Sequence, residues 1–243
     1  MQYLLVDNSN TRTKFHLASE RGFHDWRAVL KTAEISEETL RRLLESVEYD
    51  RVVICSVVPD KAEIMQSYFT KPVHLVSAES KLSIDIDYPK PEQIGADRLA
   101  NSVAAFHKYG APTVVIDSGT AVTFDIIKTP KSYSGGVIAP GLGLMTSYFI
   151  EKTALLPELK PSEPTSFIGK STLEAMNIGA LVGFRGLIRE ILTGLTDELG
   201  QVPNVIATGG DADLLFHGIK RIDRLDPDLT MEGILRIGLL NFE

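Results

Sequence analysis

Two aspartates follow short apolar segments and precede polar turns, which is a pattern suited to binding an ion or a phosphate. Val114–Ile116 lead into Asp117, which Ser118–Thr120 follow, and Leu4–Val6 lead into Asp7 in the same way. A carboxylate at the end of a buried strand is costly unless a cation or a hydrogen-bond donor meets it. Tight polar turns also present backbone N–H groups that favour anions. Both turns are therefore candidate ligand sites.

A third carboxylate stands at the predicted start of a helix. Asp97 follows Gly95-Ala96, precedes Arg98, and leads into the helical pattern of Leu99–Tyr109, which Gly110 closes. An acidic residue here can simply complement the helix dipole. The small residues before it also allow a ligand to approach the backbone closely, so a functional carboxylate beside an arginine is the second interpretation. The residues alone leave both open.

A glycine pair forms the fourth feature with chemical potential. Thr208–Gly210 lie between an expected strand at 205–207 and an expected helix at 211–217. Such a junction directs backbone N–H groups at an anion or leaves room for a flat ring. The sequence lacks the commoner motifs of nucleotide-binding sites, since it has no Walker A lysine motif and no G-x-G-x-x-G after a strand. It also has no serine nucleophile elbow and no metal-ligand spacing among its five histidines.

The elements that position these residues suggest an internal duplication. Aligning Asp7 with Asp117 places Ser9 against Gly119 and, with a one-residue gap, Phe15 against Phe124. The alternative is that any two hydrophobic hairpins look alike. Alternation of strands and helices around both hairpins predicts an α/β fold with a mixed sheet, divided into an N-terminal domain at 1–112 and a C-terminal domain at 113–243.

Several individual elements have clear signals. Ser36 is a candidate N-cap for a helix over 36–47, and 51–58 has the continuous apolar character of a buried parallel strand. A helix over 141–153 is expected with Leu144, Tyr148 and Ile150 inward. The longest helical pattern covers 171–199, and its glycines at 179, 183 and 186 favour close contact between helices. A last helix is expected over 231–242.

Composition limits the class of protein. The chain has 243 residues, 44% of them hydrophobic and 23% charged, with a net charge of −7. These values are typical of a soluble globular protein and argue against a nucleic-acid scaffold. No apolar run approaches the length of a membrane span and no signal peptide is recognised, so we expect a cytoplasmic protein.

Five motifs in order give the chain a resemblance to a known family. They are Asp7–Lys14 (DNSNTRTK), Gly95–Arg98 (GADR), Asp117–Ala121 (DSGTA), Gly135–Gly141 (GGVIAPG) and Thr208–Gly210 (TGG). Together they resemble the type III pantothenate kinases, over residues 3 to 242. The resemblance implies the fold of the actin and hexokinase ATPase superfamily, with two duplicated ribonuclease-H-like domains and a cleft between them. It also implies a homodimer and ATP-dependent phosphorylation of pantothenate to 4′-phosphopantothenate, the first step of coenzyme A biosynthesis.

The resemblance also implies roles for individual residues. Asp97 would be the catalytic base, Asp117 would hold a monovalent cation (K⁺ or NH₄⁺), and Asp7 would face the Mg²⁺ of ATP. The ATP-binding residues would be Asp7, Asn8, Ser9, Asn10, Thr11, Arg12, Thr13, Lys14 and Thr120, with Thr208–Gly210 on the adenosine side. The pantothenate-binding residues would be Tyr88, Gly95, Ala96, Asp97, Arg98 and Thr172.

One departure from the family pattern concerns the first turn. Ser9 occupies a position that is usually Gly, where a Cβ could crowd a phosphate oxygen or require a backbone angle that serine disfavours. This departure is the best support for the alternative function, a catalytically weak or inactive nucleotide-binding regulator on the same fold. A chaperone-like or filament ATPase is a third possibility, although the chain lacks the large insertions of those proteins.

Overall fold

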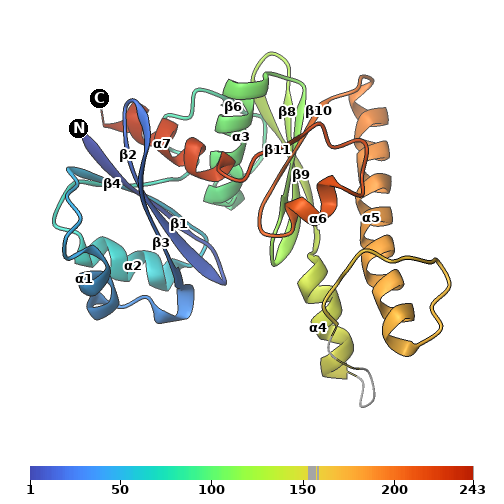
Figure 1. Ribbon diagram of the computed structural model, residues 1–243. Helices are drawn as coiled ribbons and strands as arrows, with labels where there is room; N and C mark the ends of the chain where they lie inside the picture. The colour runs from blue at the N-terminus through green and yellow to red at the C-terminus, as the bar shows by residue number, and fades with distance from the viewer. Residues whose placement is uncertain (153–156, 158, 243) are drawn as a thin grey trace. The chain divides into compact units, whose positions relative to one another are not determined.

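The computed structural model describes residues 1–152, 157 and 159–242 and divides the chain into two compact units. Unit 1 comprises Met1–Ala111, Asp125–Gly135 and the segment from Asp228 onward, whereas unit 2 comprises Pro112–Phe124 and Gly136–Pro227. The colour ramp in Figure 1 shows that unit 1 combines the blue start of the chain with its red end. Unit 1 thus includes two segments from the second half of the chain. The predicted division into domains at 1–112 and 113–243 follows the sequence repeat and remains a prediction.

The sheet of unit 1 has five strands in the order β3-β2-β1-β4-β5. Strand β1 (Gln2–Asn8) pairs antiparallel with β2 (Arg12–Ser19), which pairs antiparallel with β3 (Gly22–Lys31). On its other side β1 runs parallel to β4 (Arg51–Ser56), and β4 runs parallel to β5 (Val73–Leu75). The buried parallel strand predicted over 51–58 is therefore β4.

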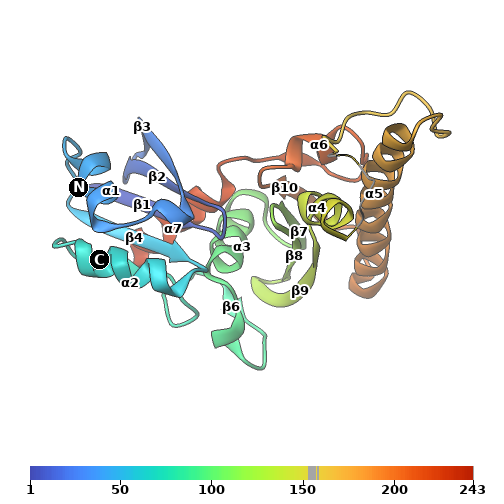
Figure 2. The same cartoon turned by 90° about the horizontal axis from the view of Figure 1, so that it is seen from below.

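Helices cover both faces of this sheet because both faces are apolar. Leu4 and Val6 belong to a core shared with α1 (Glu37–Leu44) and α2 (Pro59–Tyr68). The alternate residues, Tyr3 and Leu5, belong to a core shared with α3 (Ala96–Tyr109) and α7 (Leu229–Asn241). Ser36 caps α1 as predicted: its hydroxyl accepts a hydrogen bond from Thr39 N at 3.3 Å. Figure 2 shows the first sheet between these helices.

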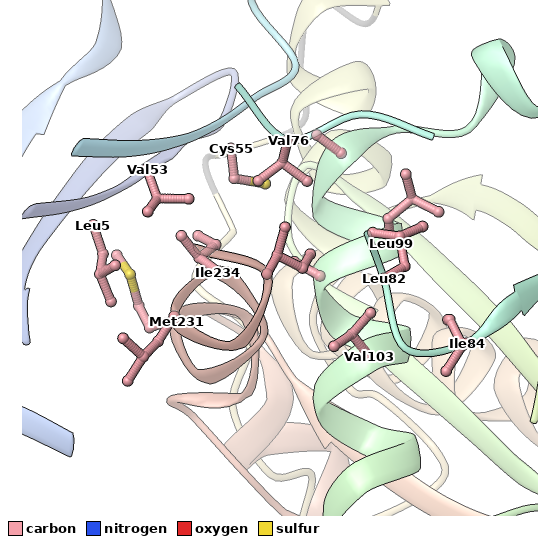
Figure 3. Close-up of a cluster of buried hydrophobic side chains, with 14 of the residues drawn as sticks. Leu5, Val53, Cys55, Val76, Leu82, Ile84, Leu99, Val103, Met231 and Ile234 are labelled. Carbon is pink, nitrogen blue, oxygen red and sulfur yellow. The ribbon is translucent and has the colours of Figure 1, made fainter. Parts of the chain in front are cut away.

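Helix α7 is largely buried in unit 1, and only part of it, which includes the charged residues Glu232 and Arg236, is partly exposed. Figure 3 shows Met231 and Ile234 of α7 between Leu5 and Val53 of the sheet and the α3 side chains. The α3 residues in this cluster, Leu99 and Val103, are fully buried. The last helix of the sequence is thereby part of the core of the first unit.

The second sheet has the strand order β11-β10-β7-β8-β9-β6. Strand β7 (Thr113–Ser118) runs parallel to β10 (Asn204–Thr208), which runs parallel to β11 (Arg224–Leu225). Strands β8 (Ala121–Lys128) and β9 (Ser132–Pro140) pass through the unit boundaries, and β6 (Asp85–Ile86) pairs with the start of β9. Short 3₁₀ turns occur at Thr32–Glu34 and Pro91–Gln93.

The two sheets confirm the duplicated fold. The series β3-β2-β1-β4-β5 in the first sheet corresponds to β9-β8-β7-β10-β11 in the second. The central strand of each runs parallel to the next strand on one side and turns back into a hairpin on the other. Asp7 and Asp117 are both the penultimate residue of that central strand. The sequence alignment of the two aspartates therefore matches the topology.

The helices of unit 2 are α4 (Leu142–Lys152), α5 (Thr172–Leu199) and α6 (Ala212–Phe216). Helix α5 is continuous over its length, and the Ser171 hydroxyl caps it by accepting from Glu174 N. Figure 2 shows α4 beside α5. The orientation predicted for α4 was wrong: Leu144 is 50% exposed and Tyr148 is 60% exposed, because α4 buries Leu142 and Thr146 instead. The Ile150 side chain and Thr153 lie outside the described residues.

Membrane insertion has no structural support in the described helices. Not one of them combines the length and the apolar composition that crossing a bilayer requires. Even α5, the longest, carries charged residues along its length.

Candidate active site

The carboxylate of Asp7 is the centre of the first polar turn. Its residue is only 4% exposed, and the pairing of β1 with β2 places Lys14 directly opposite it. Ser9 Oγ donates a hydrogen bond to Asp7 Oδ1 at 3.0 Å, and Lys14 Nζ lies 3.5 Å from Asp7 Oδ2. Burial raises the pKa of Asp7, while Lys14 and Ser9 oppose that rise. A buried carboxylate with only partial compensation favours a cation.

Side-chain hydrogen bonds hold the backbone of this turn. Asn8 Nδ2 donates to Thr13 Oγ1 at 2.7 Å, and Ser56 Oγ donates to Asn8 Oδ1 at 2.6 Å. Thr32 Oγ1 donates to the carbonyl oxygen of Ser9 at 2.6 Å. The tip, Asn10–Arg12, is exposed. These hydrogen bonds hold the loop in one conformation while the polar groups at its tip stay accessible, as phosphate binding requires.

Ser9 fits this turn without backbone strain. Among the described residues other than glycine, a positive φ occurs only at Ser83. Ser9 therefore does not need the left-handed conformation that glycine would supply. Its hydroxyl is bonded to Asp7, so the side chain that replaces the usual glycine hydrogen contributes a donor to the carboxylate.

The carboxylate of Asp97 lies in the first turn of α3. Its Oδ1 accepts a hydrogen bond from Arg98 N at 2.8 Å. A Cβ on Gly95 would lie 2.6 Å from the same oxygen, so the absence of a side chain there makes room for the carboxylate. Burial raises the pKa of Asp97, the Arg98 backbone N–H opposes that rise, and the negative charge of Asp7 adds to it. The position of Asp97 at a helix start predicts a lowered pKa, and this prediction is wrong because burial outweighs the effect of the helix terminus. Both interpretations of Asp97, as a dipole partner and as a functional carboxylate, remain predictions.

The side chain of Arg98 is held by a residue that the sequence analysis did not select. Arg98 Nε donates to Asp125 Oδ1 at 2.7 Å, and the Tyr133 hydroxyl donates to the same oxygen at 3.3 Å. Asp125 and Tyr133 are fully buried. The available signal was Asp125 itself, an acid between Phe124 and Ile126 in an apolar strand, because a charge in such a strand needs a partner.

Tyr88 lies next to this group in unit 1. Its ring centroid is 6.3 Å from that of Tyr133, and a Cβ on Gly135 would contact the Tyr88 ring at 3.5 Å. Tyr88 packs against the apolar cluster that contains Ala96 and Tyr133, and the Tyr133 ring in turn lies 5.9 Å from Arg98 Cζ. The structure thus brings five predicted acceptor-side residues together in unit 1: Tyr88, Gly95, Ala96, Asp97 and Arg98.

The second polar turn belongs to unit 2. Asp117 is half-buried at the end of β7, where the parallel register places Thr208 of β10 beside it. Gly209 follows with φ of +93°, and a Cβ there would lie 2.5 Å from Asp117 Oδ1 and collide with the Ser118 backbone. Only glycine fits both this φ and this approach. Gly209, the first glycine of the pair, therefore lies directly against the second aspartate, a contact that the sequence did not reveal.

The other two predicted residues of unit 2 are exposed. Thr120 lies at the tip of the β7–β8 hairpin, and Thr172 is the first residue of α5. The Thr120 carbonyl accepts a hydrogen bond from Gly141 N at 3.0 Å, and the roles of both threonines remain predictions.

The side chains near the two turns suit a magnesium ion that binds mainly to a nucleotide rather than to a site made of protein ligands alone. Within the described part of the chain no cluster of three or more His, Cys, Asp or Glu side chains could hold a metal ion. Mg²⁺ keeps several waters and commonly binds through one carboxylate plus substrate phosphates. Asp7 can supply that carboxylate, and Asp117 beside the Gly209 backbone has the single charge and compact surroundings that suit a monovalent cation.

Comparison with known proteins gives the family. The family model for type III pantothenate kinase matches residues 3–194. A type III pantothenate kinase from Akkermansia muciniphila is 54% identical over 234 residues, covering 96% of this chain and 97% of that protein.

Two solved structures support the fold. One, described as a Baf family transcriptional activator from Campylobacter jejuni, aligns with a TM-score of 0.65 at 21% identity, covering 96% of each chain. The other, the activator of 2-hydroxyisocaproyl-CoA dehydratase from Clostridium difficile, aligns with a TM-score of 0.56 at 11% identity, covering 100% of this chain and 94% of that one. With its two ribonuclease-H-like sheets and its matched sequence, the chain belongs to the type III pantothenate kinase family.

Proposed function

We propose that the protein transfers the γ-phosphoryl group of ATP to the primary hydroxyl of pantothenate, the first step of coenzyme A biosynthesis. The observation that carries the proposal is the Asp97–Arg98 pair. A half-buried carboxylate of raised pKa lies beside an anchored guanidinium, in a chain that matches pantothenate kinases over nearly its whole length. These groups suit an acceptor that has a hydroxyl at one end and a carboxylate at the other.

Asp97 acts on the hydroxyl. It orients the O–H group and accepts its proton as the oxygen attacks the phosphorus atom, while the bond between phosphorus and the β,γ-bridging oxygen breaks and ADP leaves. Phosphoryl transfer passes through a loose transition state, so a carboxylate that mainly orients the nucleophile is sufficient. Its raised pKa improves proton acceptance without requiring a strong base.

The first turn provides the phosphate side of unit 1. Lys14 and the backbone N–H groups of the exposed tip at 10–12 would bind phosphate oxygens. Asp7, to which the Ser9 hydroxyl donates a hydrogen bond, would face the Mg²⁺ of ATP. Mg²⁺ bound with ATP supplies charge neutralisation of the phosphates. Thr120 and Asp117 contribute the corresponding polar turn of unit 2, with K⁺ or NH₄⁺ at Asp117 and Thr208–Gly210 toward the adenosine.

A homodimer formed through unit 2 is part of the proposal. Apolar side chains are exposed on and before α5 and on α4: Leu144, Tyr148, Phe167, Ile168 and Leu173. Among the described residues, no atom outside their own helix lies within 4 Å of where a Cβ would lie on the α5 glycines at 179, 183 and 186. Close helix contact within the chain therefore does not account for them, whereas a second copy would. A specific interface should bury at least about 1,200 Å² in total. Thr172, which we propose binds pantothenate, is the first residue of α5. We also propose that the protein is cytoplasmic.

The inactive-regulator alternative loses its main support, because Ser9 is unstrained and bonded to Asp7. The decisive experiment is ADP release by the purified protein with Mg²⁺, K⁺ and ATP, with and without pantothenate. We expect ADP release that depends on pantothenate and a product mass increased by one phosphate. ADP release that is equal with and without pantothenate would identify an ATPase, and none in either condition would support a regulator.

A further inference from the structure

We propose that Asp125 is a positioning residue that aims the Arg98 guanidinium at the carboxylate of the acceptor substrate. The inference rests on the proposed function, since it takes pantothenate as the acceptor. Asp125 lies on β8, far from Arg98 in sequence, and all the groups involved belong to unit 1.

The first argument is the geometry of the pair. Arg98 Nε donates to Asp125 Oδ1 at 2.7 Å, and the two side chains are 12% and 0% exposed. A bond at Nε fixes the plane and the direction of the whole guanidinium group, because the group is rigid. Asp125 therefore determines where the terminal nitrogens of Arg98 lie.

The second argument is an unsatisfied donor. Arg98 Nη2 is buried and has no hydrogen-bond partner in the described part of the chain. A buried N–H group without an acceptor is costly, and in a charged guanidinium the cost is greater. An acceptor with a carboxylate would satisfy it, and arginine recognises carboxylates through paired N–H donors. The positive charge and the unpaired N–H donor of Arg98 together suit a ligand that brings a carboxylate.

The third argument is the way in which Tyr133 supports Asp125. Its hydroxyl donates to the same Oδ1 that Arg98 uses, at 3.3 Å, and its ring centroid lies 5.9 Å from Arg98 Cζ. Burial raises the pKa of Tyr133, so it remains a neutral donor. Tyr133 therefore fixes the rotamer of the carboxylate and borders the guanidinium at the same time.

A buried ion pair by itself is weak evidence for stability, because desolvation of both charges offsets their attraction. What the Arg98–Asp125 pair supplies is direction. A role confined to stability would affect all ligands equally, whereas a positioning role affects only an acceptor that carries the negative charge. The distinction can be measured with two acceptors that differ at that group alone: pantothenate, and its alcohol pantothenol.

The test compares Asp125→Asn with wild type. Asparagine keeps the shape and an oxygen that can still accept from both Arg98 Nε and the Tyr133 hydroxyl, but it loses the negative charge, so its hold on the guanidinium weakens. We expect the KM for pantothenate to rise by about 10- to 100-fold, the range for removing a hydrogen bond to a charged group. The KM for ATP and the KM for pantothenol should be unchanged, and kcat should change much less than the pantothenate KM. The Asp125→Asn variant should therefore show a smaller preference for pantothenate over pantothenol than wild type does.

Two further variants control the result. Tyr133→Phe removes only the second donor and should shift the same preference in the same direction by a smaller factor; it decides the matter if Asp125→Asn does not fold. Asp85→Asn changes an exposed aspartate and should leave all constants unchanged. Equal loss for both acceptors and for ATP, or an unaltered preference in both Asp125→Asn and Tyr133→Phe, would overturn the proposal. Wild type that fails to turn over pantothenate would instead contradict the proposed function, and pantothenate binding by calorimetry would then test Asp125 separately.

Discussion

Replacing Asp97 by asparagine tests the proposed chemistry most directly. Asparagine has the same shape, and its side-chain oxygen can still accept from Arg98 N, a bond of 2.8 Å in the structure. What disappears is the charge and the capacity to take a proton. Loss of a general base typically costs about 10²–10⁴-fold in rate, which corresponds to about 3–5 kcal/mol of transition-state free energy.

Nucleotide binding should survive the substitution. In the part of the chain that the structure describes, Asp97 has no hydrogen bond to the first turn, and its interaction with Asp7 is a repulsion between like charges. The assay is therefore steady-state kinetics with ATP varied at saturating pantothenate, together with ATP binding by calorimetry. We expect kcat to fall by the factor above while the dissociation constant for ATP is unchanged or slightly lower.

The same substitution should stabilise the protein. Because burial raises the pKa of Asp97, the folded state binds a proton more readily than the unfolded state, and its stability falls as pH rises from the unfolded pKa, about 3.9, through the higher folded value. Above that window the full cost of the buried charge is present. Asp97→Asn should therefore melt at a higher temperature than wild type at pH 7, and the difference should disappear in acid.

Two outcomes would refute this reasoning. Near-normal kcat in Asp97→Asn would show that Asp97 is not the base. A melting temperature that is lower at pH 7, and no closer to wild type in acid, would show that the carboxylate stabilises the fold as an anion, contrary to its raised pKa.

Three further predictions concern the two turns. Asp7→Asn should weaken Mg²⁺–ATP binding and turnover together. It also removes the charge that raises the pKa of Asp97, so the pH at which activity falls in acid should be lower than in wild type. An unchanged acid limb in the pH profile of kcat would contradict this electrostatic link. Ser9→Gly removes the hydroxyl that donates to Asp7, so the pKa of Asp7 should rise further and the Mg²⁺ dependence of activity should change; identical Mg²⁺ titrations would show that the hydroxyl has no such role. Activity should rise with K⁺ or NH₄⁺ and hardly with Na⁺, and Asp117→Asn should abolish the difference; equal activity of wild type in Na⁺ would exclude the cation role of Asp117.

The sequence was most informative where local chemistry decides the structure. The two Asp-turn hairpins, the Ser36 cap and the buried strand β4 follow from patterns within a few residues, and the structure confirms them. Tyr88 and the Gly95–Arg98 segment are also neighbours in the structure. Their assignment as pantothenate-binding residues remains a prediction.

Contacts between distant segments could not be predicted in this way. The Asp125–Arg98 pair joins β8 to α3, and Gly209 meets Asp117 only because β10 runs beside β7. The orientation of α4 was predicted wrongly because its apolar residues occupy more than one side, so periodicity could not select the side that packs. Single-chain patterns likewise could not assign α7 to the first unit.

The position of α7 in the core of unit 1 has a consequence for how the protein is made. Met231 and Ile234 complete a cluster whose other members include Leu5 and Val53, which are synthesised much earlier than α7. Until α7 leaves the ribosome, the sheet face that α3 and α7 share is only partly covered, so the N-terminal strands cannot complete their fold as they emerge. Contacts that close across most of a chain slow folding and leave apolar surface exposed meanwhile. The nascent chain is therefore a natural client for a chaperone that shields β1 and β4, and a stop codon just before Asp228 should leave an insoluble product.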